Sequence, residues 1–260
     1  MKKAFFKKTL ALVVASSLIS FVLAACGSEK SSEPQSSGES GGANVIKIGA
    51  VFPLSGDAAP LGEQSKNAIE LAVEEINANG GIKSMNGAKL QMVWADSQGN
   101  QQVAQSETSR LITQEKVALL TGAYQSGVTI PASQEAEKHK KIWVAGVPSD
   151  DLITERGLKY VFRIADTTTM RVQAQIQFLN DMREKSDIKT VAMVYENSSW
   201  GQGVAKYWET ELPKNGYEIV LNEPYDRKAT DLTPVVTKVK NANPDVIMMV
   251  SYTQDATLLA

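Results

Sequence analysis

The sequence predicts an α/β fold made of two doubly wound parallel-sheet lobes. Short apolar runs rich in Val, Ile and Ala recur along the chain, and amphipathic helical patterns separate them. The same alternation starts a second time near residue 167. Apolar runs of this kind suit parallel strands covered on both faces. Strands that alternate with helices favour a parallel sheet over the other fold classes.

The stretch 45–82 shows this pattern most clearly. Residues 45–52 form a near-continuous apolar run, which predicts a strand, and a loop rich in Pro, Ser and Gly follows it. Because ligands bind at the carboxyl ends of strands in open α/β sheets, this loop belongs to a candidate site. The helix after the loop has apolar residues spaced for one buried face: Ile69, Ala72, Val73 and Ile76.

The remaining elements follow in order along the chain. Further strands are predicted at 88–96, 117–122, 142–147, 190–195, 217–225 and 245–252. Helices are predicted at 100–115, 128–138, from about 170, after 200 and at 232–244. The last three strands alternate with helices as those of the first lobe do. Residues 160–166 are predicted to cross in an extended form between the lobes, and Thr167–Thr169 to cap the next helix.

Residues 1–25 are predicted to be a targeting segment. Four lysines precede an apolar stretch, residues 9–22, that is short for a membrane-spanning helix. Leu23-Ala24-Ala25-Cys26 resembles a bacterial lipobox, which implies cleavage before Cys26 and a lipid on its thiol. The alternatives are an ordinary secretory signal in which Cys26 is incidental, and an uncleaved anchor.

Residues 26–44 are rich in Ser, Gly, Glu and Pro, and predict a flexible tether. The predicted domains are therefore the signal 1–25, the tether 26–44, an N-terminal lobe 45–165 and a second lobe 166–260. Without the signal, the chain carries 23 basic and 29 acidic residues. This acidic balance argues against a nucleic-acid partner, which would favour a basic patch.

The segment IKIGAVFPLSGDAAPLGEQSKNAIELAVEEINANGGI resembles the first βα unit of periplasmic binding proteins of the leucine/isoleucine/valine-binding type. The resemblance implies a ligand cleft between the two lobes and an ABC permease as partner. It also implies an amino acid as ligand. Members of this family are longer, so the chain is expected to be a fragment or a truncated frame, with sheet edges and apolar helix faces left uncovered.

The resemblance also implies site residues at the loops that follow strands. Ser126 matches the family position that contacts a ligand carboxylate, and the start of a helix there favours an anion. The alternative is that Ser126 only caps its own helix. Val147 and Ser149 match a family carbonyl and hydroxyl, although Ser149 could equally be an ordinary turn residue.

Aromatic and apolar residues complete the site that the resemblance implies. Trp200 and Tyr252 match family tyrosines of the second lobe, and Trp200 is expected at a loop tip. The alternative for Trp200 is packing against neighbouring loops. Leu61 stands where the branched-chain binder has a tryptophan, and Tyr124 is a further possible wall. These departures leave the side chain of the ligand open.

Signatures of enzymes are weak. Gly201-Gln202-Gly203 begins a dinucleotide-binding pattern, but Lys206 occupies the place of the third glycine. The single histidine, His139, is expected near a helix end, and the carboxylate pairs such as Asp150-Asp151 on solvated surface. With one histidine and a lipidated cysteine, we expect no metal and no cofactor.

The sequence thus favours a lipid-anchored, extracytoplasmic binding protein of an ABC importer rather than an enzyme. The ligand is expected to be an amino acid, branched-chain or similar. The alternatives are a ligand-sensing receptor module, or a binder of a small amide or carboxylate such as urea. Fold alone does not separate these possibilities.

Overall fold

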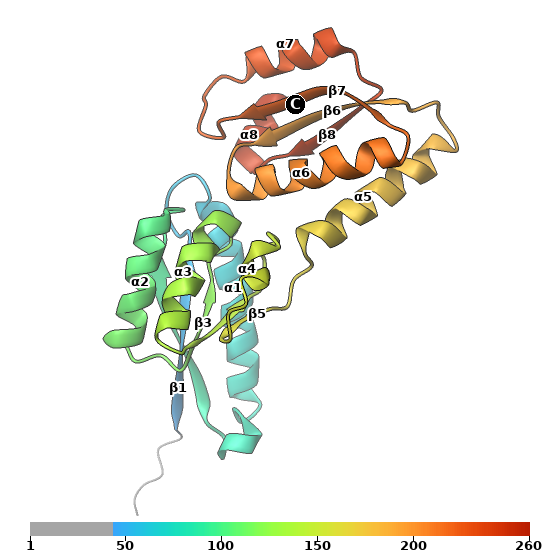
Figure 1. The fold of residues 1–260 in the computed structure, drawn as a ribbon. Helices are drawn as coiled ribbons and strands as arrows, with labels where there is room; N and C mark the ends of the chain where they lie inside the picture. Colours follow the sequence, from blue (N-terminus) through green and yellow to red (C-terminus); the bar gives the residue numbers. More distant parts are fainter. Residues whose placement is uncertain (1–43) are drawn as a thin grey trace, which may run out of the picture. The chain divides into compact units, whose positions relative to one another are not determined.

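The computed structural model describes residues 44–260. The predicted signal peptide, Cys26 and nearly all of the tether lie outside the described residues. Within residues 44–260 no helix is long and apolar enough to span a membrane. The strands and helices alternate as the sequence predicts, in two parallel sheets (Figure 1).

The first sheet has five parallel strands in the order β2-β1-β3-β4-β5. Helix α1 covers one face of this sheet and helices α2 and α3 cover the other (Figure 1). The strands are β1 (Val45–Phe52), β2 (Lys89–Asp96), β3 (Leu119–Gly122), β4 (Ile142–Ala145) and β5 (Val161–Arg163). The helices are α1 (Ala59–Ala78), the 3-10 turn η1 (Lys83–Met85), α2 (Gln101–Thr113), α3 (Ser126–Lys138) and α4 (Leu152–Glu155).

The second sheet has three parallel strands in the order β7-β6-β8. Helix α6 lies on one face with α5 beside it, and α7 lies on the other (Figure 1). The strands are β6 (Thr190–Glu196), β7 (Glu218–Tyr225) and β8 (Val246–Val250). The helices are α5 (Thr168–Arg183), α6 (Ser199–Lys214), α7 (Thr233–Ala242) and α8 (Thr253–Leu259).

Each sheet has its own apolar core. Trp143 and Leu120 are fully buried between the first sheet and helices α2 and α3. Trp208 and Met193 are fully buried between the second sheet and helices α5 and α6. The indole Nε1 of Trp208 donates to Gln175 Oε1 at 2.8 Å, which satisfies the one polar atom of this ring. These cores hold the strand ends, and therefore the loops, in fixed positions.

The predicted buried face of α1 is wrong. Ile69 and Val73 are only half-buried, and Ala72 and Ile76 are exposed. Gly62 is the one buried residue of this helix, although α1 also contacts the sheet in its last turn, where Asn77 bonds to Leu90 of β2. A Cβ on Gly62 would lie 1.8 Å from the carbonyl oxygen of Pro53. The close approach of α1 to the end of β1 therefore requires glycine here.

Two further expectations are corrected. Residues 161–163 do not simply cross between lobes, since they form strand β5 and pair with β4. The helical spacing of Met182 and Leu179 predicts that both face the core, but Met182 is exposed whereas Leu179 is buried. Apolar periodicity locates a helix face, but the end of a helix can extend beyond the surface that it covers.

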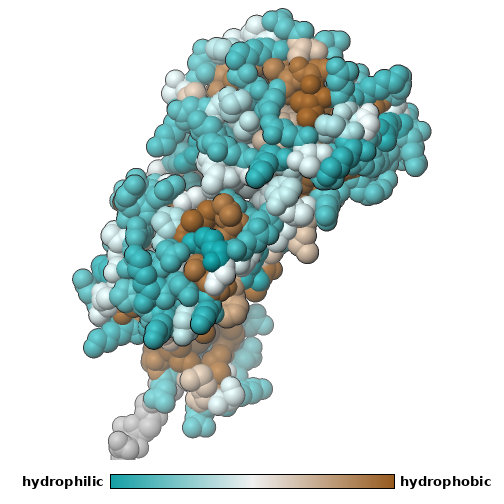
Figure 2. Space-filling model, in the orientation of Figure 1, coloured by the Kyte–Doolittle hydropathy of each residue, from teal (hydrophilic) through white to brown (hydrophobic). Residues whose placement is uncertain are grey.

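Some apolar side chains remain exposed, as the sequence led us to expect. On the edge strand β8, Ile247 and Met249 are largely exposed, and Phe178 of α5 lies in the same apolar depression. Figure 2 shows that apolar areas interrupt the mainly hydrophilic face in view. Such areas are commonly contact surfaces in folded proteins.

Candidate ligand-binding site

The strand order of both sheets points to one location for a site. In the first sheet β1 lies between β2 and β3, and in the second sheet β6 lies between β7 and β8. Chain connections leave in opposite directions at such a reversal, and a crevice opens at the carboxyl ends of the strands. Residues in the loops or first helical turns after β1, β3, β4, β5, β6 and β8 all line one cavity.

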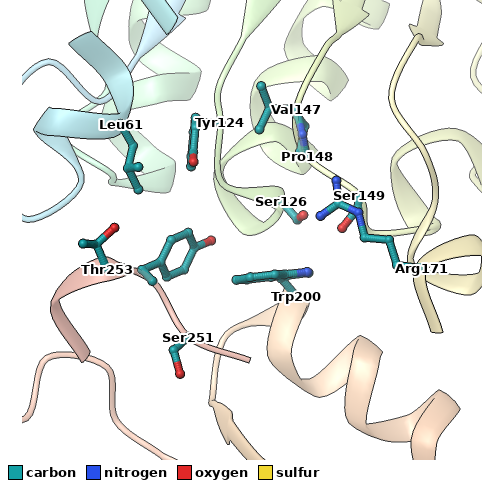
Figure 3. A pocket seen from close by; sticks show the side chains of 11 residues that line it. Leu61, Tyr124, Ser126, Val147, Pro148, Ser149, Arg171, Trp200, Ser251 and Thr253 are labelled. Atoms are coloured by element: carbon teal, nitrogen blue, oxygen red, sulfur yellow. The ribbon is translucent and has the colours of Figure 1, made fainter. Parts of the chain in front are cut away.

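This cavity has a volume of about 170 Å³ (Figure 3). It brings together all seven residues that the sequence proposed for the site, and their part in binding stays a prediction. Its lining consists of Leu61, Tyr124, Ser126, Val147, Pro148, Ser149, Arg171, Trp200, Ser251, Tyr252 and Thr253. Pro148, Arg171, Ser251 and Thr253 were not expected. Three of these four adjoin expected residues in the sequence, but Arg171 does not.

Ser126 is the first residue of α3 and is 3% exposed. The expected alternative, that it caps its own helix, is wrong, because the N-cap residue is Gln125 and makes no side-chain cap bond. The Ser126 hydroxyl oxygen instead accepts from the N–H of Asp150 at 3.3 Å. Its own hydrogen is therefore available to the cavity.

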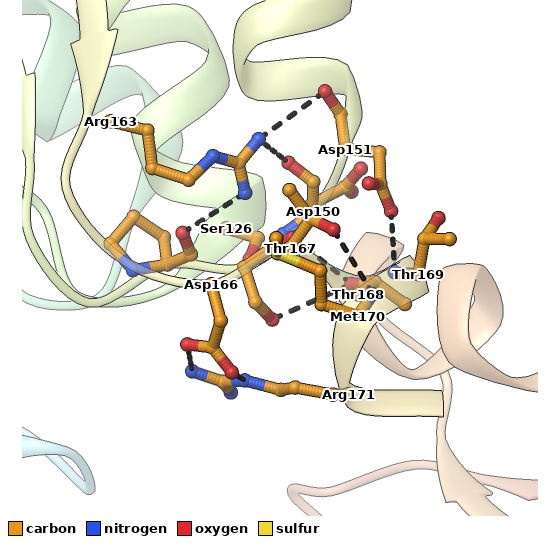
Figure 4. Close-up of polar contacts among 12 residues, drawn as sticks. Ser126, Asp150, Asp151, Arg163, Asp166, Thr167, Thr168, Thr169, Met170 and Arg171 are labelled. Atoms are coloured by element: carbon orange, nitrogen blue, oxygen red, sulfur yellow. Dashed lines mark hydrogen bonds and ion pairs between the residues drawn. The ribbon is translucent and has the colours of Figure 1, made fainter. Parts of the chain in front are cut away.

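Ser149 is 1% exposed and lies in a loop that is fixed from two sides. Its carbonyl oxygen accepts from the N–H of Thr168 at 2.7 Å and from the Thr168 hydroxyl at 3.1 Å. The Arg163 guanidinium donates to the carbonyl oxygen of Asp150 at 2.8 Å (Figure 4). It also donates to the Thr154 hydroxyl at 2.9 Å. These bonds hold the loop after β4 against the N-terminus of α5.

Asp150 and Asp151 were expected on solvated surface, and this expectation is wrong. They are 6% and 7% exposed. One Asp150 oxygen accepts from the N–H of Leu152 at 3.0 Å. One Asp151 oxygen accepts from the N–H of Thr169 at 3.2 Å (Figure 4). Each carboxylate thus satisfies a free N–H in the first turn of a helix. Burial nevertheless raises the pKa of Asp150 above its ordinary value.

Trp200 and Tyr252 form an aromatic wall. Their ring centroids are 5.1 Å apart and the planes are inclined by 59°, a favourable tilted arrangement. Trp200 was expected at a loop tip, but it belongs to the first turn of α6, where Ser198 caps its N–H at 3.3 Å. The buried indole Nε1 of Trp200 has no hydrogen-bond partner among the described residues. Burial raises the pKa of Tyr252 strongly, so its phenol is a neutral hydrogen-bonding group.

Tyr124 and Leu61 stand on the opposite side of the cavity in Figure 3. The backbone of Tyr124 has φ = +73°. This value lies in the left-handed region, which residues other than glycine seldom adopt. Such backbone strain is often found where a side chain is held in a functional position. Burial also raises the pKa of Tyr124.

Arg171 is the only ionised side chain in the lining, which otherwise holds only neutral residues. Asp166 holds it through two bonds, Nε to Oδ2 at 2.6 Å and Nη2 to Oδ1 at 2.9 Å (Figure 4). These hydrogen bonds raise the pKa of Arg171 and lower the pKa of Asp166. In the sequence, Arg171 only precedes the buried Val172 in a helical pattern, so nothing distinguishes it from a solvated residue.

The Gly201-Gln202-Gly203 pattern has a packing role in the structure. A Cβ on Gly201 would lie 1.8 Å from the carbonyl oxygen of Glu196, so glycine lets α6 approach the end of β6. The fully buried Glu196 carboxylate accepts from the N–H groups of Ser198 at 2.9 Å and Gly201 at 3.1 Å. A protein carboxylate therefore already occupies the anion position at this helix start.

Metal ligands are not clustered in the described part of the chain. Among residues 44–260 no group of three or more His, Cys, Asp or Glu side chains is arranged to hold a metal ion. His139, at the C-terminal end of α3, lies 3.2 Å from Glu135 Oε1 and far along the helix from the cavity. The cavity itself offers hydroxyl groups, ring systems and one guanidinium.

Comparison with known proteins identifies the family. Residues 45–260 match the family model described as periplasmic binding protein. A Leu/Ile/Val-binding protein homolog 7 from Brucella abortus is 37% identical over 225 residues, which cover 82% of this chain and 54% of the relative. The chain thus spans about half the length of the curated relatives it matches.

Solved structures agree with this assignment. The branched-chain amino acid transporter substrate-binding protein LivJ from Streptococcus pneumoniae, solved with isoleucine, is 32% identical with a TM-score of 0.70. The match covers 80% of this chain and 57% of LivJ. The leucine-binding protein LivK from Thermotoga maritima has a TM-score of 0.73 at 20% identity, covering 82% of this chain and 58% of LivK, and shows the shared fold. The chain belongs to the periplasmic binding protein family.

Proposed function

We propose that this chain is the ligand-binding part of an extracytoplasmic substrate-binding protein of an ABC importer, and that its ligand is an amino acid with a branched or similar side chain. One observation carries the proposal: a single cavity at the strand ends of both sheets has hydrogen-bond donors on one side and apolar or aromatic groups on the other. The isoleucine complex of the related S. pneumoniae protein supports the amino-acid class.

The first sheet would hold the carboxylate. Ser126 supplies a hydroxyl donor, and the first N–H groups of α3 have no partner within the helix. Ser149 lies beside them with a second buried hydroxyl. Hydroxyl groups and helix N–H groups together favour an anionic group at this position.

The opposite side of the cavity would hold the side chain. Leu61 and Tyr124 come from the first sheet, and Trp200 and Tyr252 from the second. Its volume of about 170 Å³ is below the range of roughly 300–1,000 Å³ that is usual for drug-sized ligands. A molecule the size of one amino acid fits this limit.

Binding would be a cycle of opening and closing rather than a reaction. Residues 164–167, which connect β5 to α5, are the segment between the two sheets, and rotation there would move Trp200 and Tyr252 away from Ser126. The closed form would then deliver the ligand to a membrane permease. Cys26 would carry the lipid that anchors the protein outside the cytoplasm, with residues 27–44 as its tether.

Thermal unfolding tests this function. The purified chain is heated with and without a panel of amino acids, amides, urea and small carboxylates, because a ligand that binds only the folded state raises the unfolding midpoint by mass action. Branched-chain amino acids are expected to raise the midpoint. The Ser126→Ala variant is expected to lose most of this shift, whereas Ser106→Ala on the exposed face of α2 keeps it.

The results of this experiment distinguish the amino-acid proposal from its alternatives and test the role of Ser126. A shift with an amide or urea but with no amino acid would contradict the amino-acid proposal. A cooperative transition that no member of the panel shifts would contradict the binding of this ligand class by this chain. An equal shift in Ser126→Ala would remove Ser126 from the site.

A further inference from the structure

We propose that Gly127 and Ser199 form the stop at which the two lobes come to rest when they close, and that Gly127 is thereby a positioning residue for ligand binding. This inference rests on the proposed function, because it concerns the closing movement around the ligand. A larger residue at position 127 would hold the lobes apart, although every side chain that lines the cavity would be unchanged.

Gly127 and Ser199 belong to different lobes but lie next to each other. Gly127 is the second residue of α3, and Ser199 is the first residue of α6. A Cβ on Gly127 would lie 3.2 Å from the Ser199 Oγ, which is tighter than an ordinary van der Waals contact. The next atom, Gln101 Nε2 of the first lobe, would lie at an ordinary 3.5 Å. The first obstacle to a side chain at position 127 is therefore the other lobe.

Ser199 is enclosed from a second direction. Its Oγ atom is buried, and Ser199 lines a second cavity together with Asp150 of the first lobe. Burial raises the pKa of Asp150, and the nearby Ser199 hydroxyl opposes this rise. Ser199 thus lies against two segments of the first lobe, the start of α3 and the loop after β4. These neighbours limit how far its hydroxyl can move away from position 127.

The contact adjoins two residues that line the cavity from different lobes. Gly127 follows Ser126, and Ser199 precedes Trp200. Figure 3 shows Ser126 and Trp200 near each other, one on a ribbon of each lobe. Each neighbouring pair lies in the first turn of a helix, so a displacement at the contact also moves Ser126 from Trp200. A gap of roughly 0.5–1 Å already forfeits a quarter to a half of the dispersion attraction between two groups.

The backbone at position 127 does not itself require glycine. Gly127 lies within α3 and is not one of the described glycines with positive φ. Alanine is a better helix former than glycine. The fold of the chain without ligand should therefore tolerate alanine at this position, whereas closure should not. This difference separates a positioning role from a purely structural one.

The test measures binding of leucine, isoleucine and valine by isothermal titration, and their dissociation rates by stopped flow. The variants are Gly127→Ala, Gly127→Val and the double variant Gly127→Ala with Ser199→Ala, which removes the Oγ atom that the new methyl group would meet. Gly203→Ala is the matched control, because it makes the same exchange in α6 where nothing lies within 4 Å of the new Cβ.

Gly127→Ala is expected to raise Kd about fivefold and Gly127→Val at least 30-fold, the scale of overpacking at a close contact. Most of the change should lie in faster dissociation. The unfolding midpoint of Gly127→Ala without ligand should be equal to or above that of the unaltered chain. The double variant should return Kd to within about twofold of the unaltered value, since the two residues are in contact and their effects couple. Gly203→Ala should bind as the unaltered chain does.

Two results would overturn the inference while leaving the proposed function intact. One is a Kd that Gly127→Val leaves unchanged, and the other is a loss of affinity in Gly127→Ala that Ser199→Ala does not rescue. If none of the three amino acids binds the unaltered chain, the proposed function fails and this inference fails with it. Should Gly127→Val not fold, Gly127→Ala and its rescue still decide whether the contact limits closure.

Discussion

Arg227 and Asp57 form an ion pair between segments of the two sheets, with Arg227 Nη1 2.8 Å from Asp57 Oδ2. Asp57 lies in the loop between β1 and α1, and Arg227 follows β7. The same guanidinium lies over the ring of Tyr252, 5.2 Å from its centroid, and Tyr252 packs on Trp200. The pair therefore connects a loop of the first sheet to the aromatic wall of the cavity.

Arg227→Met should weaken ligand binding without unfolding the chain. The variant loses the contact that joins the two segments, so closure around the ligand is less favourable. Partly exposed ion pairs contribute up to about 1 kcal/mol, which corresponds to an increase in Kd of roughly three- to fivefold. Isothermal titration measures the Kd. Lys214→Met, which removes a pair of equal length to Glu211 within α6, is the control. An unchanged Kd in Arg227→Met would show that the ion pair has no part in closure.

Trp200 should report ligand binding by fluorescence. The chain has four tryptophans, of which Trp200 lines the cavity, so a bound ligand is expected to change its emission. Trp200→Phe should abolish this change, whereas Trp94→Phe should retain it because Trp94 packs against Phe52 outside the lining. Trp200→Ala should in addition raise Kd by roughly 10- to 100-fold, the scale of a buried aromatic contact residue. A ligand response that survives in Trp200→Phe would place the ligand elsewhere.

Asp150→Asn should stabilise the fold at neutral pH and not at acidic pH. Burial raises the pKa of Asp150 above its ordinary 3.8, with Asp151 adding to the rise and the Leu152 N–H and Arg163 opposing it. The folded state therefore binds the proton more tightly than the unfolded state, and stability falls as pH rises from about 4 through the folded pKa. An asparagine carries no charge and keeps an oxygen for the Leu152 N–H.

Unfolding by urea at pH 4 and pH 7 measures this effect. The difference between Asp150→Asn and the unaltered chain should be small at pH 4 and should favour the variant at pH 7. Glu63→Gln on the exposed face of α1 is the control. A variant that is less stable at pH 7 would mean that the charge itself is required by the helix starts nearby.

Gly201→Ala and Gly203→Ala should have opposite effects although they are two residues apart. The new methyl group at position 201 would overlap the Glu196 carbonyl, at 1.8 Å, whereas at position 203 nothing lies within 4 Å. Forced overpacking costs about 1–3 kcal/mol or more, and glycine to alanine in an open helical position gains up to about 1 kcal/mol. Differential scanning calorimetry measures both midpoints. Equal midpoints would contradict the close contact between α6 and β6.

Sequence reasoning located the cavity because its residues follow strands. Ser126, Val147 and Ser149 come directly after apolar runs, and parallel strands bring their carboxyl ends to one edge. Trp200 and Tyr252 follow strands of the second sheet in the same way. The periodicity of the chain and the resemblance to the family were together enough to place these residues at the cavity.

The same reasoning failed where packing across the fold decides the outcome. Asp150 and Asp151 look like a solvated acidic pair in the sequence, yet two helix starts and Arg163 enclose their loop. The apolar stripe of α1 looks buried, but the described residues cover it only in part. Burial depends on what lies opposite a side chain, and no local pattern contains that information.

The sequence by itself therefore determined the alternation of strands and helices, the family, and the loops that meet at the cavity, because each of these depends on local periodicity and on residues next to a strand end. Only the tertiary structure placed Arg171 in the lining and joined Arg227 to Asp57. Both arginines are polar residues with no distinguishing neighbours in sequence. Their positions result from the packing of elements that are distant along the chain, so only the folded arrangement determines which charged side chains lie at the cavity.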